Sequence, residues 1–259
     1  TPESVMSPEI VSPILQFGRH GSNAGQPLSR RDGVLKVTGR ATYAADNHPK
    51  SMLYAVMAVS RIARGKVTSL DVAAAKAHPG VVEVFTSANR PPLSHDPAEK
   101  TPPFGFRVEV LQDDTVRYVN QPIALVVAET LEAATEGAML LNPRYEVEPA
   151  RTGPDDGERY PPSAVGVGAP PQTAYGDIEA GMSKATKVME ADYSTPAQYH
   201  NALEPHAVVA EWDGDHVTLD MPNQALALSA ASYARYFGIP PENVLIRSPF
   251  LGGGFGSKA

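Results

Sequence analysis

The last nine residues constrain the fold of this chain more than any other stretch. Residues 251–259 read Leu-Gly-Gly-Gly-Phe-Gly-Ser-Lys-Ala and place four glycines around one aromatic residue. Glycine loses more backbone entropy on ordering than any other residue, so such a run is unfavourable inside a helix or strand. A strand-like segment at 243–247 precedes the run, and phenylalanine is usually buried, which together favour an ordered loop over a free tail. We therefore expect a loop whose backbone N–H groups approach a ligand closely.

Two familiar nucleotide-binding patterns do not match this run. A P-loop requires a lysine followed by serine or threonine, whereas Lys258 follows Ser257 and precedes Ala259. The dinucleotide-binding fingerprint requires a third glycine at the position of Ser257. Both nucleotide readings are therefore rejected.

A second motif lies upstream of the glycine run. Residues 198–206 read Gln-Tyr-His-Asn-Ala-Leu-Glu-Pro-His. In this order and spacing the two motifs resemble two segments in the molybdenum-binding subunit of the xanthine dehydrogenase and aldehyde oxidase family, namely the active-site glutamine segment and the glycine loop. Within that family the sequence is most similar to bacterial aldehyde oxidoreductases. The resemblance runs from about Arg31 to the last residue. It includes an opening pattern for which we expect turn and packing roles: Asp32, Gly33, Lys36, Thr38, Gly39, Tyr43 and Asp46.

The resemblance implies an α+β fold in two parts. We expect an a/b hammerhead domain at 31–149 and the first part of a molybdopterin-binding α+β domain at 173–259. An extended N-terminal arm is expected at 1–30, where proline, serine and glycine occur without periodicity. A linker is expected at 150–172, where proline and glycine are mixed with scattered acidic residues.

Local patterns predict most elements of the two parts. Strands buried on both faces are expected at 52–59 and 122–128, where apolar residues run continuously. Other segments have strand-like composition: 34–39 (a strand or turn), 81–86, 144–147, 186–194, 206–212, 215–220 and 243–247. Helices are expected at 71–77 with Ser69 as N-cap, at 130–141, and at 225–237 with Gly238 as C-cap.

Gln198 is the first catalytic candidate. A neutral amide can donate a hydrogen bond without competing as a metal ligand, and the resemblance implies that this glutamine faces the oxo group of the molybdenum. The resemblance also implies that Gly253, Gly254, Phe255 and Gly256 contact the pterin. The Phe255 ring is expected to form a wall that excludes water from the site.

His200, Glu204 and His206 present an alternative, a metal site of their own. Their positions at i, i+4 and i+6 match neither a helical zinc motif nor one face of a strand, so zinc is rejected. We expect instead a buried pair between Glu204 and a histidine of this segment, packed beneath the site. Gln224 is a weaker candidate, because the family commonly has Thr-Gln there and this chain has Asn-Gln. No direct metal ligand is expected from this chain.

Composition limits the partners and the compartment. The formal net charge of −7 and a pI of about 5.5 argue against a nucleic-acid surface. Because the sequence has no cysteine, iron–sulfur clusters cannot be bound within it. No apolar stretch is long enough to cross a bilayer and no signal-peptide pattern opens the sequence, so both the bacterial cytoplasm and the periplasm stay open.

The resemblance implies part of a molybdenum hydroxylase that oxidises aldehydes or N-heterocycles with oxygen derived from water. The implied cofactors are molybdenum–molybdopterin, in the plain or the cytosine dinucleotide form, with iron–sulfur clusters and FAD on partner subunits. The implied partners are the C-terminal portion of the subunit or a split-half chain, an iron–sulfur subunit, and an FAD subunit or cytochrome. The family's catalytic glutamate lies farther downstream, so we expect no turnover by these 259 residues alone.

Ala259 bears on the substrate. It stands where purine-oxidising members of the family carry a purine-binding glutamate, which disfavours xanthine and favours aldehydes or apolar heterocycles. Two other classes of function are alternatives to a molybdenum hydroxylase. A non-catalytic scaffold or assembly protein would keep the fold without molybdenum or pterin, whereas an unrelated ligand-binding module is disfavoured by the two ordered motifs.

Overall fold

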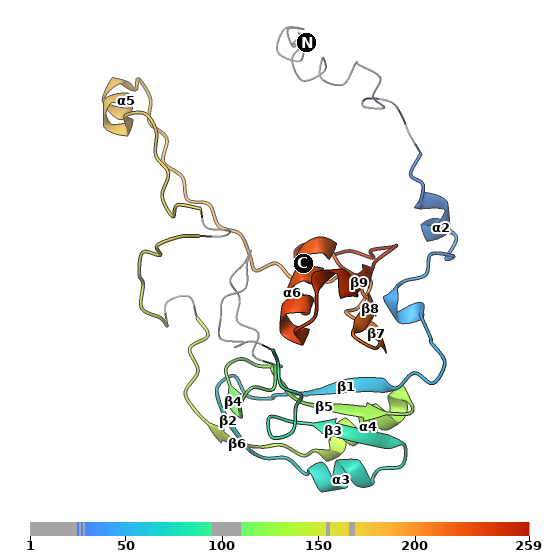
Figure 1. The fold of residues 1–259 in the computed structure, drawn as a ribbon. Helices are drawn as coiled ribbons and strands as arrows, with labels where there is room; N and C mark the ends of the chain where they lie inside the picture. Colours follow the sequence, from blue (N-terminus) through green and yellow to red (C-terminus); the bar gives the residue numbers. More distant parts are fainter. Residues whose placement is uncertain are drawn as a thin grey trace.

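The computed structural model describes residues 25, 27, 29–94, 110–153, 156–165 and 169–258. Within these residues the chain forms three sheets of three strands each, and helices pack on two of them (Figure 1). Most of the arm expected at 1–30 lies outside the described residues, as does Ala259.

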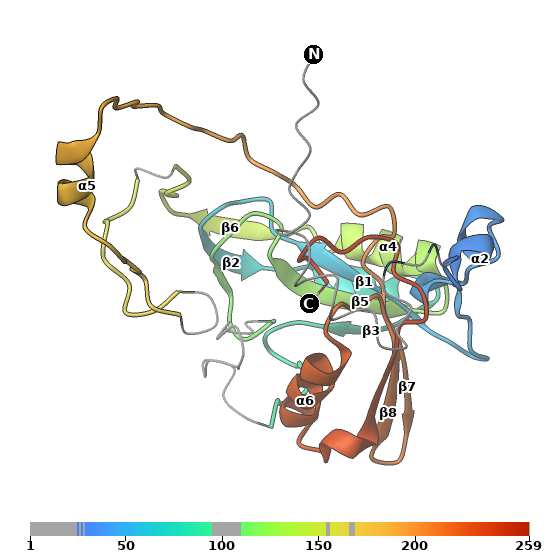
Figure 2. The same cartoon turned by 90° about the horizontal axis from the view of Figure 1, so that it is seen from above.

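The first sheet is built around an apolar central strand. Its order is β1 (Tyr54–Val59), β5 (Pro122–Ala128) and β3 (Val81–Phe85), and both pairings are antiparallel. The helices α3 (Val72–Ala77) and α4 (Leu131–Leu140) pack on it, and Figure 2 shows α4 lying along β1 and β5. The buried core between these layers comprises Ala75, Val84, Ala124, Val126 and Leu141. The predicted strands at 81–86 and 122–128 and the helix at 130–141 are therefore confirmed.

Two expectations for this region are wrong. The strand β1 is buried on one face only, since its exposure alternates and Met57 is 57% exposed. It is an edge strand with a helix over one face, so its continuous apolar run does not mean burial on both sides. The N-cap of α3 is Asp71, not Ser69, and its Oδ1 accepts a hydrogen bond from the Ala74 N–H at 3.0 Å.

A second sheet consists of β4 (Thr115–Val116), β2 (Gly65–Ser69) and β6 (Arg144–Val147), paired antiparallel. Of these strands only β6 was predicted. The strand or turn expected at 34–39 is instead the helix α2 (Gly33–Val37), which the short helix η1 (Ala44–Asp46) follows. An ion pair between Asp32 and Lys36 at 2.9 Å and a hydrogen bond from Thr38 Oγ1 to the Val34 carbonyl at 2.7 Å stabilise α2 locally.

The third sheet contains β7 (Val209–Asp213), β8 (His216–Asp220) and β9 (Val244–Arg247). β7 and β8 are antiparallel, whereas β8 and β9 are parallel and are joined through α6 (Leu226–Phe237) and the short helix η2 (Pro241–Asn243). Gly238 ends α6 with φ of 69°, the left-handed conformation expected of a C-cap. The core under α6 comprises Val217, Leu219, Ala234, Val244 and Ile246.

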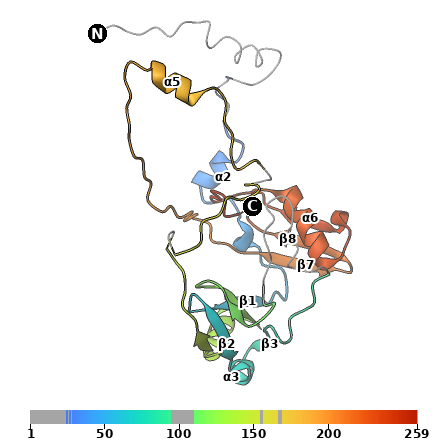
Figure 3. The same cartoon turned by 90° about the vertical axis from the view of Figure 1, so that its left-hand side faces the viewer.

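The segment between the second and third sheets has little regular structure. It contains the helix α5 (Ile178–Lys184), which lies apart from all three sheets in Figures 1 and 3. The strand predicted at 186–194 is absent, because no other described strand lies beside it to complete its hydrogen bonds. Met189 and Tyr193 are accordingly 87% and 88% exposed. Among the helices of the described part, none has the length and apolarity needed to span a membrane.

Candidate active site

The candidate site lies at the carboxyl ends of the parallel strands β8 and β9. Because the two strands run in the same direction, the loops that follow them, 221–225 and 248–258, emerge at one edge of the sheet. This edge is where open parallel sheets usually bind their ligands. The glycine run identified in the sequence is therefore the loop that follows β9.

The loop after β8 is held in place by Asn223. Its Oδ1 accepts a hydrogen bond from the Ala225 N–H at 2.7 Å, and its Nδ2 donates to Ser229 Oγ at 2.8 Å. Its own N–H donates to Ser248 Oγ at 3.1 Å, which ties the two loops together. These contacts orient the neighbouring Gln224 toward the glycine loop.

Gln224 holds the far end of the glycine loop. Its side-chain Oε1 accepts hydrogen bonds from the N–H of Gly256 at 3.0 Å and of Lys258 at 3.4 Å. Its backbone N–H donates to the Lys258 carbonyl at 2.6 Å. Gln224, a weaker candidate from sequence, is thus the residue that binds this end of the loop.

Glu204 holds the near end of the same loop. Its Oε2 accepts from the Gly252 N–H at 2.7 Å, and its own N–H donates to the Gly252 carbonyl at 3.1 Å. The ammonium of Lys258 donates to the Glu204 carbonyl at 2.7 Å and lies 3.2 Å from Oε2. The expected buried Glu–His pair is therefore wrong: Glu204 is buried, but its ionic partner is Lys258, and His200 and His206 are both exposed.

Two of the loop glycines are required by close approach. A Cβ on Gly252 would lie 2.4 Å from Glu204 Cβ, and one on Gly254 would lie 2.4 Å from Gln224 Cδ and Oε1. Gly253 and Gly256 have φ of +101° and +98°, which side chains other than glycine's rarely adopt. The glycines therefore let the backbone pass between the two residues that hold it.

The middle of the loop offers donors without partners. Within the described residues the N–H groups of Gly253, Gly254 and Phe255 make no hydrogen bond. Phe255 has φ of 56° and its side chain is 72% exposed, so the expected water-excluding wall is not closed by these residues. Three adjacent free donors on a held backbone fit a bound group that is rich in acceptor atoms.

The segment 198–206 packs against this loop through residues other than Gln198. An added Cβ at Gly253 would lie 3.3 Å from Ala202 Cβ, and one at Gly256 would lie 3.8 Å from His200 Nε2. The Gln198 side chain is exposed, and its Nε2 donates to the Pro196 carbonyl at 3.4 Å. The structure joins Glu204 to the loop by hydrogen bonds, whereas among the described residues the Gln198 amide makes none with the loop.

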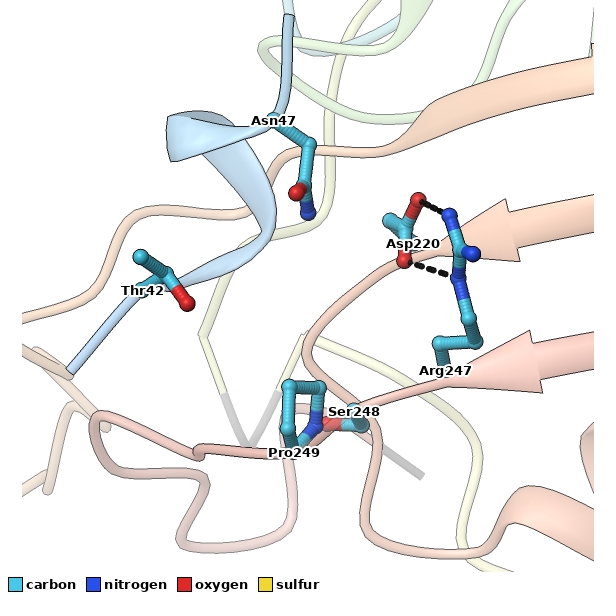
Figure 4. Close-up of a pocket in the computed structure, with 6 residues that line it drawn as sticks. All are labelled: Thr42, Asn47, Asp220, Arg247, Ser248 and Pro249. Carbon is cyan, nitrogen blue, oxygen red and sulfur yellow. Dashed lines mark hydrogen bonds and ion pairs between the residues drawn. The ribbon is translucent and has the colours of Figure 1, made fainter.

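A cavity of about 510 Å³ lies beside the site. Asp220 and Arg247, the last residues of β8 and β9, form a doubly hydrogen-bonded ion pair at its wall, with Arg247 Nε 2.7 Å from Asp220 Oδ1 (Figure 4). The bonds to this carboxylate raise the pKa of Arg247 above its ordinary value. The residues lining the cavity are Thr42, Asn47, Asp220, Arg247, Ser248 and Pro249. None of them belongs to the stretch 251–258, so this cavity is separate from the free donors of the glycine loop.

Sequence reasoning missed Lys258, Asn223 and the Asp220–Arg247 pair. A lysine beside a glycine loop usually suggests phosphate binding. Nothing in the sequence near Lys258 predicts that its side chain is instead buried against Glu204. Among the described residues, no three His, Cys, Asp or Glu side chains converge as a metal site.

Comparison with known proteins assigns both parts of the chain. The model of the aldehyde oxidase and xanthine dehydrogenase a/b hammerhead domain matches residues 38–149. The model of the molybdopterin cofactor-binding domain matches residues 162–259 and includes the glycine loop. The chain belongs to the aldehyde oxidase and xanthine dehydrogenase family. The expected α+β fold, a hammerhead domain followed by a molybdopterin-binding domain, is confirmed.

Individual members of this family match over most of the chain. The molybdenum-binding subunit PaoC of an aldehyde oxidoreductase from Escherichia coli O157:H7 is 37% identical over 239 residues, covering 90% of this chain and 31% of PaoC. The nicotine 6-hydroxylase large subunit of Paenarthrobacter nicotinovorans is 29% identical, covering 91% of this chain and 30% of the relative. The crystal structure of quinoline 2-oxidoreductase from Pseudomonas putida 86 superposes with a TM-score of 0.69 at 25% identity, covering 89% and 31% of the two chains. This chain therefore spans about a third of the length of these relatives.

Proposed function

We propose that this chain is part of a molybdenum hydroxylase that oxidises aldehydes or N-heterocycles with oxygen derived from water. The observation that carries the proposal is the glycine loop, held at Gly252 by Glu204 and at Gly256 by Gln224, with three unpaired N–H groups between. The relatives support an enzyme over a scaffold, because their names describe two oxidoreductases and a hydroxylase.

The loop residues Gly253, Gly254, Phe255 and Gly256 are proposed to hold the molybdopterin. The N–H groups of Gly253, Gly254 and Phe255, which make no hydrogen bond within the described residues, would donate to acceptor atoms of the bound group. The two held ends of the loop keep those donors aligned before binding. When bound, the molybdenum–molybdopterin group supplies the two-electron oxidation of the substrate C–H bond. Phe255, now exposed, would pack against that group or the protein around it and exclude water.

Gln198 is proposed as the residue that touches a ligand of the bound metal. Its amide has one weak contact, to the Pro196 carbonyl at 3.4 Å, so it is available to reorient. Glu204, six positions later in the same segment, is already joined to the loop. A rotation of the backbone between Gln198 and Glu204 would bring the Gln198 amide toward the N–H groups of residues 253–255.

Partners must complete the reaction. The sequence has no cysteine, so iron–sulfur clusters that carry electrons away would lie on another subunit. We propose that an FAD subunit or a cytochrome accepts the electrons from that subunit, and that the pterin is in the plain or the cytosine dinucleotide form. The general base is proposed to lie in the region of the relatives that this chain does not span.

Substrate preference is proposed from Ala259, which lies outside the described residues. The alanine side chain cannot hydrogen-bond a purine, so a purine gains no binding energy at this position. A site without such a partner separates apolar substrates only weakly and therefore accepts many of them. Aldehydes, aromatic ones included, and apolar N-heterocycles are therefore the expected class.

The test is a side-by-side assay of the natural full-length assembly with benzaldehyde, quinoline and xanthine, together with molybdenum and pterin analysis. We expect about one molybdenum and one pterin per subunit, with kcat/KM highest for benzaldehyde or quinoline. Xanthine as the clear best substrate would overturn the substrate assignment. An assembly free of molybdenum and pterin would overturn the enzyme assignment and favour a scaffold.

A further inference from the structure

The ion pair between Glu204 and Lys258 is unusual in its burial. The Lys258 side chain is 0% exposed and that of Glu204 is 7% exposed. By contrast, the Asp220–Arg247 pair leaves its arginine 55% exposed, and the Lys76–Glu83 pair leaves both partners more than a third exposed. Surface pairs of that kind contribute little, whereas a buried one needs a structural reason.

Stability is not that reason. Removing two charges from water is unfavourable, and replacing a buried ion pair by apolar groups is often neutral or stabilising. The Glu204 carboxylate is also incompletely satisfied, since its Oε1 is buried without a hydrogen-bond partner in the described residues. Neither residue belongs to the apolar core beneath α6.

The contacts of Lys258 and Glu204 show that the pair joins the two ends of the glycine loop. Lys258 ends the glycine loop and its Nζ reaches the Glu204 carbonyl, while the Glu204 carboxylate binds the Gly252 N–H at the start of the loop. Residues 252–258 are thereby closed into a ring through Glu204. That ring holds the three free N–H groups against the segment that carries Gln198.

We propose that Lys258 and Glu204 are a positioning pair, which fixes the spacing between the glycine loop and the Gln198 segment for the reaction. The inference rests on the proposed function. Without the Lys258 ammonium, Glu204 would be a buried carboxylate with Gly252 N–H as its remaining donor, so the segment would move toward water. The backbone donors at 253–255 would then lose their alignment with the bound group.

The experiment uses the full-length subunit in its natural assembly. The variants are Lys258→Met, Glu204→Gln and the double variant, with Lys76→Met as the matched control on an exposed ion pair far from the site. Three quantities are measured: kcat per bound molybdenum, KM, and the rate of pterin release from the purified complex, followed by the fluorescence of the oxidised pterin.

We expect Lys258→Met to lower kcat per molybdenum by about 10- to 100-fold, as loss of a positioned group does, with little change in KM. Pterin release should be several-fold faster, and Lys76→Met should match the wild type. The double variant should recover part of the loss, because it leaves no uncompensated buried charge. Because kcat is counted per bound molybdenum, a loss that affected only folding or loading would not lower it.

Two results would overturn the positioning role. One is Lys258→Met with wild-type turnover and pterin retention. The other is poor loading in which each loaded molecule still turns over at the wild-type rate, which is what a folding role alone would produce. A wild-type assembly without pterin or oxidase activity would instead refute the proposed function, and the control measurement on the wild type separates that case.

Discussion

Replacing Gly254 by alanine is expected to release the glycine loop at the point where Gln224 holds it. The added Cβ would lie 2.4 Å from both Cδ and Oε1 of Gln224, far inside van der Waals contact. Gly254 has no positive φ, unlike its neighbours Gly253 and Gly256, so alanine can adopt its backbone conformation. The substitution therefore tests the steric contact without added backbone strain.

The size of the effect follows from the bonds that Gln224 makes. To relieve the clash its side chain must swing away, which breaks the bonds to the N–H of Gly256 at 3.0 Å and of Lys258 at 3.4 Å. The first is of normal length and the second is long, so together they are worth about 1–2 kcal/mol. That energy corresponds to a loss of about tenfold in the population of the held loop.

The assay is kcat per bound molybdenum in the full-length assembly, with pterin retention as the second readout. We expect both to fall for Gly254→Ala, kcat by about tenfold if turnover requires the held loop. Gly181→Ala in α5 is the matched control, because no other atom lies within 4 Å of its added Cβ. Unchanged kcat and pterin retention in Gly254→Ala would refute the role of Gln224 in holding the loop.

Three further outcomes are expected. Gln198→Ala should lower kcat about 10²-fold with metal content retained, and unchanged turnover would refute its assignment. Limited proteolysis of the 259-residue chain should cut first in the proposed linker at 150–172 or within residues 1–30 rather than within β5, as sequencing of the fragments would establish. The pKa of Glu83 lies below its usual value because Lys76 and the Val84 N–H bind the carboxylate. This group therefore adds stability above its unfolded pKa and loses that contribution as the pH falls through the folded pKa. The difference in Tm between the wild type and Lys76→Met should accordingly be largest near pH 7 and shrink toward about pH 2; a difference independent of pH would contradict it.

The elements that the sequence predicted best are those decided by neighbouring residues. A helix satisfies its hydrogen bonds within itself, so the predicted start near Thr130 and the predicted C-cap at Gly238 mark α4 and α6 correctly. The glycine loop was also recognisable locally, because few backbones other than a closely approached loop need so many glycines. The apolar run of β5 is long enough to predict a buried strand from the sequence.

Strand pairing was decided by the tertiary structure. The segment 186–194 has a strand-like composition yet forms none here, because a strand completes its hydrogen bonds only with a partner. The short strands β2 and β4 carry weak patterns and exist through their pairing with each other and with β6. Whether β1 is buried on one face or two likewise depends on where α4 packs.

The sequence by itself predicted that residues 252–258 form a close-approach loop and, through the family resemblance, that 198–206 lies near it. Only the tertiary structure decided which side chains join them. Glu204 and Lys258 are 54 positions apart, and Gln224 and Gly256 are 32 apart, so no local periodicity connects either pair. A buried charge takes the nearest available partner in space, which is why Glu204 binds Lys258 rather than His206, its neighbour in sequence.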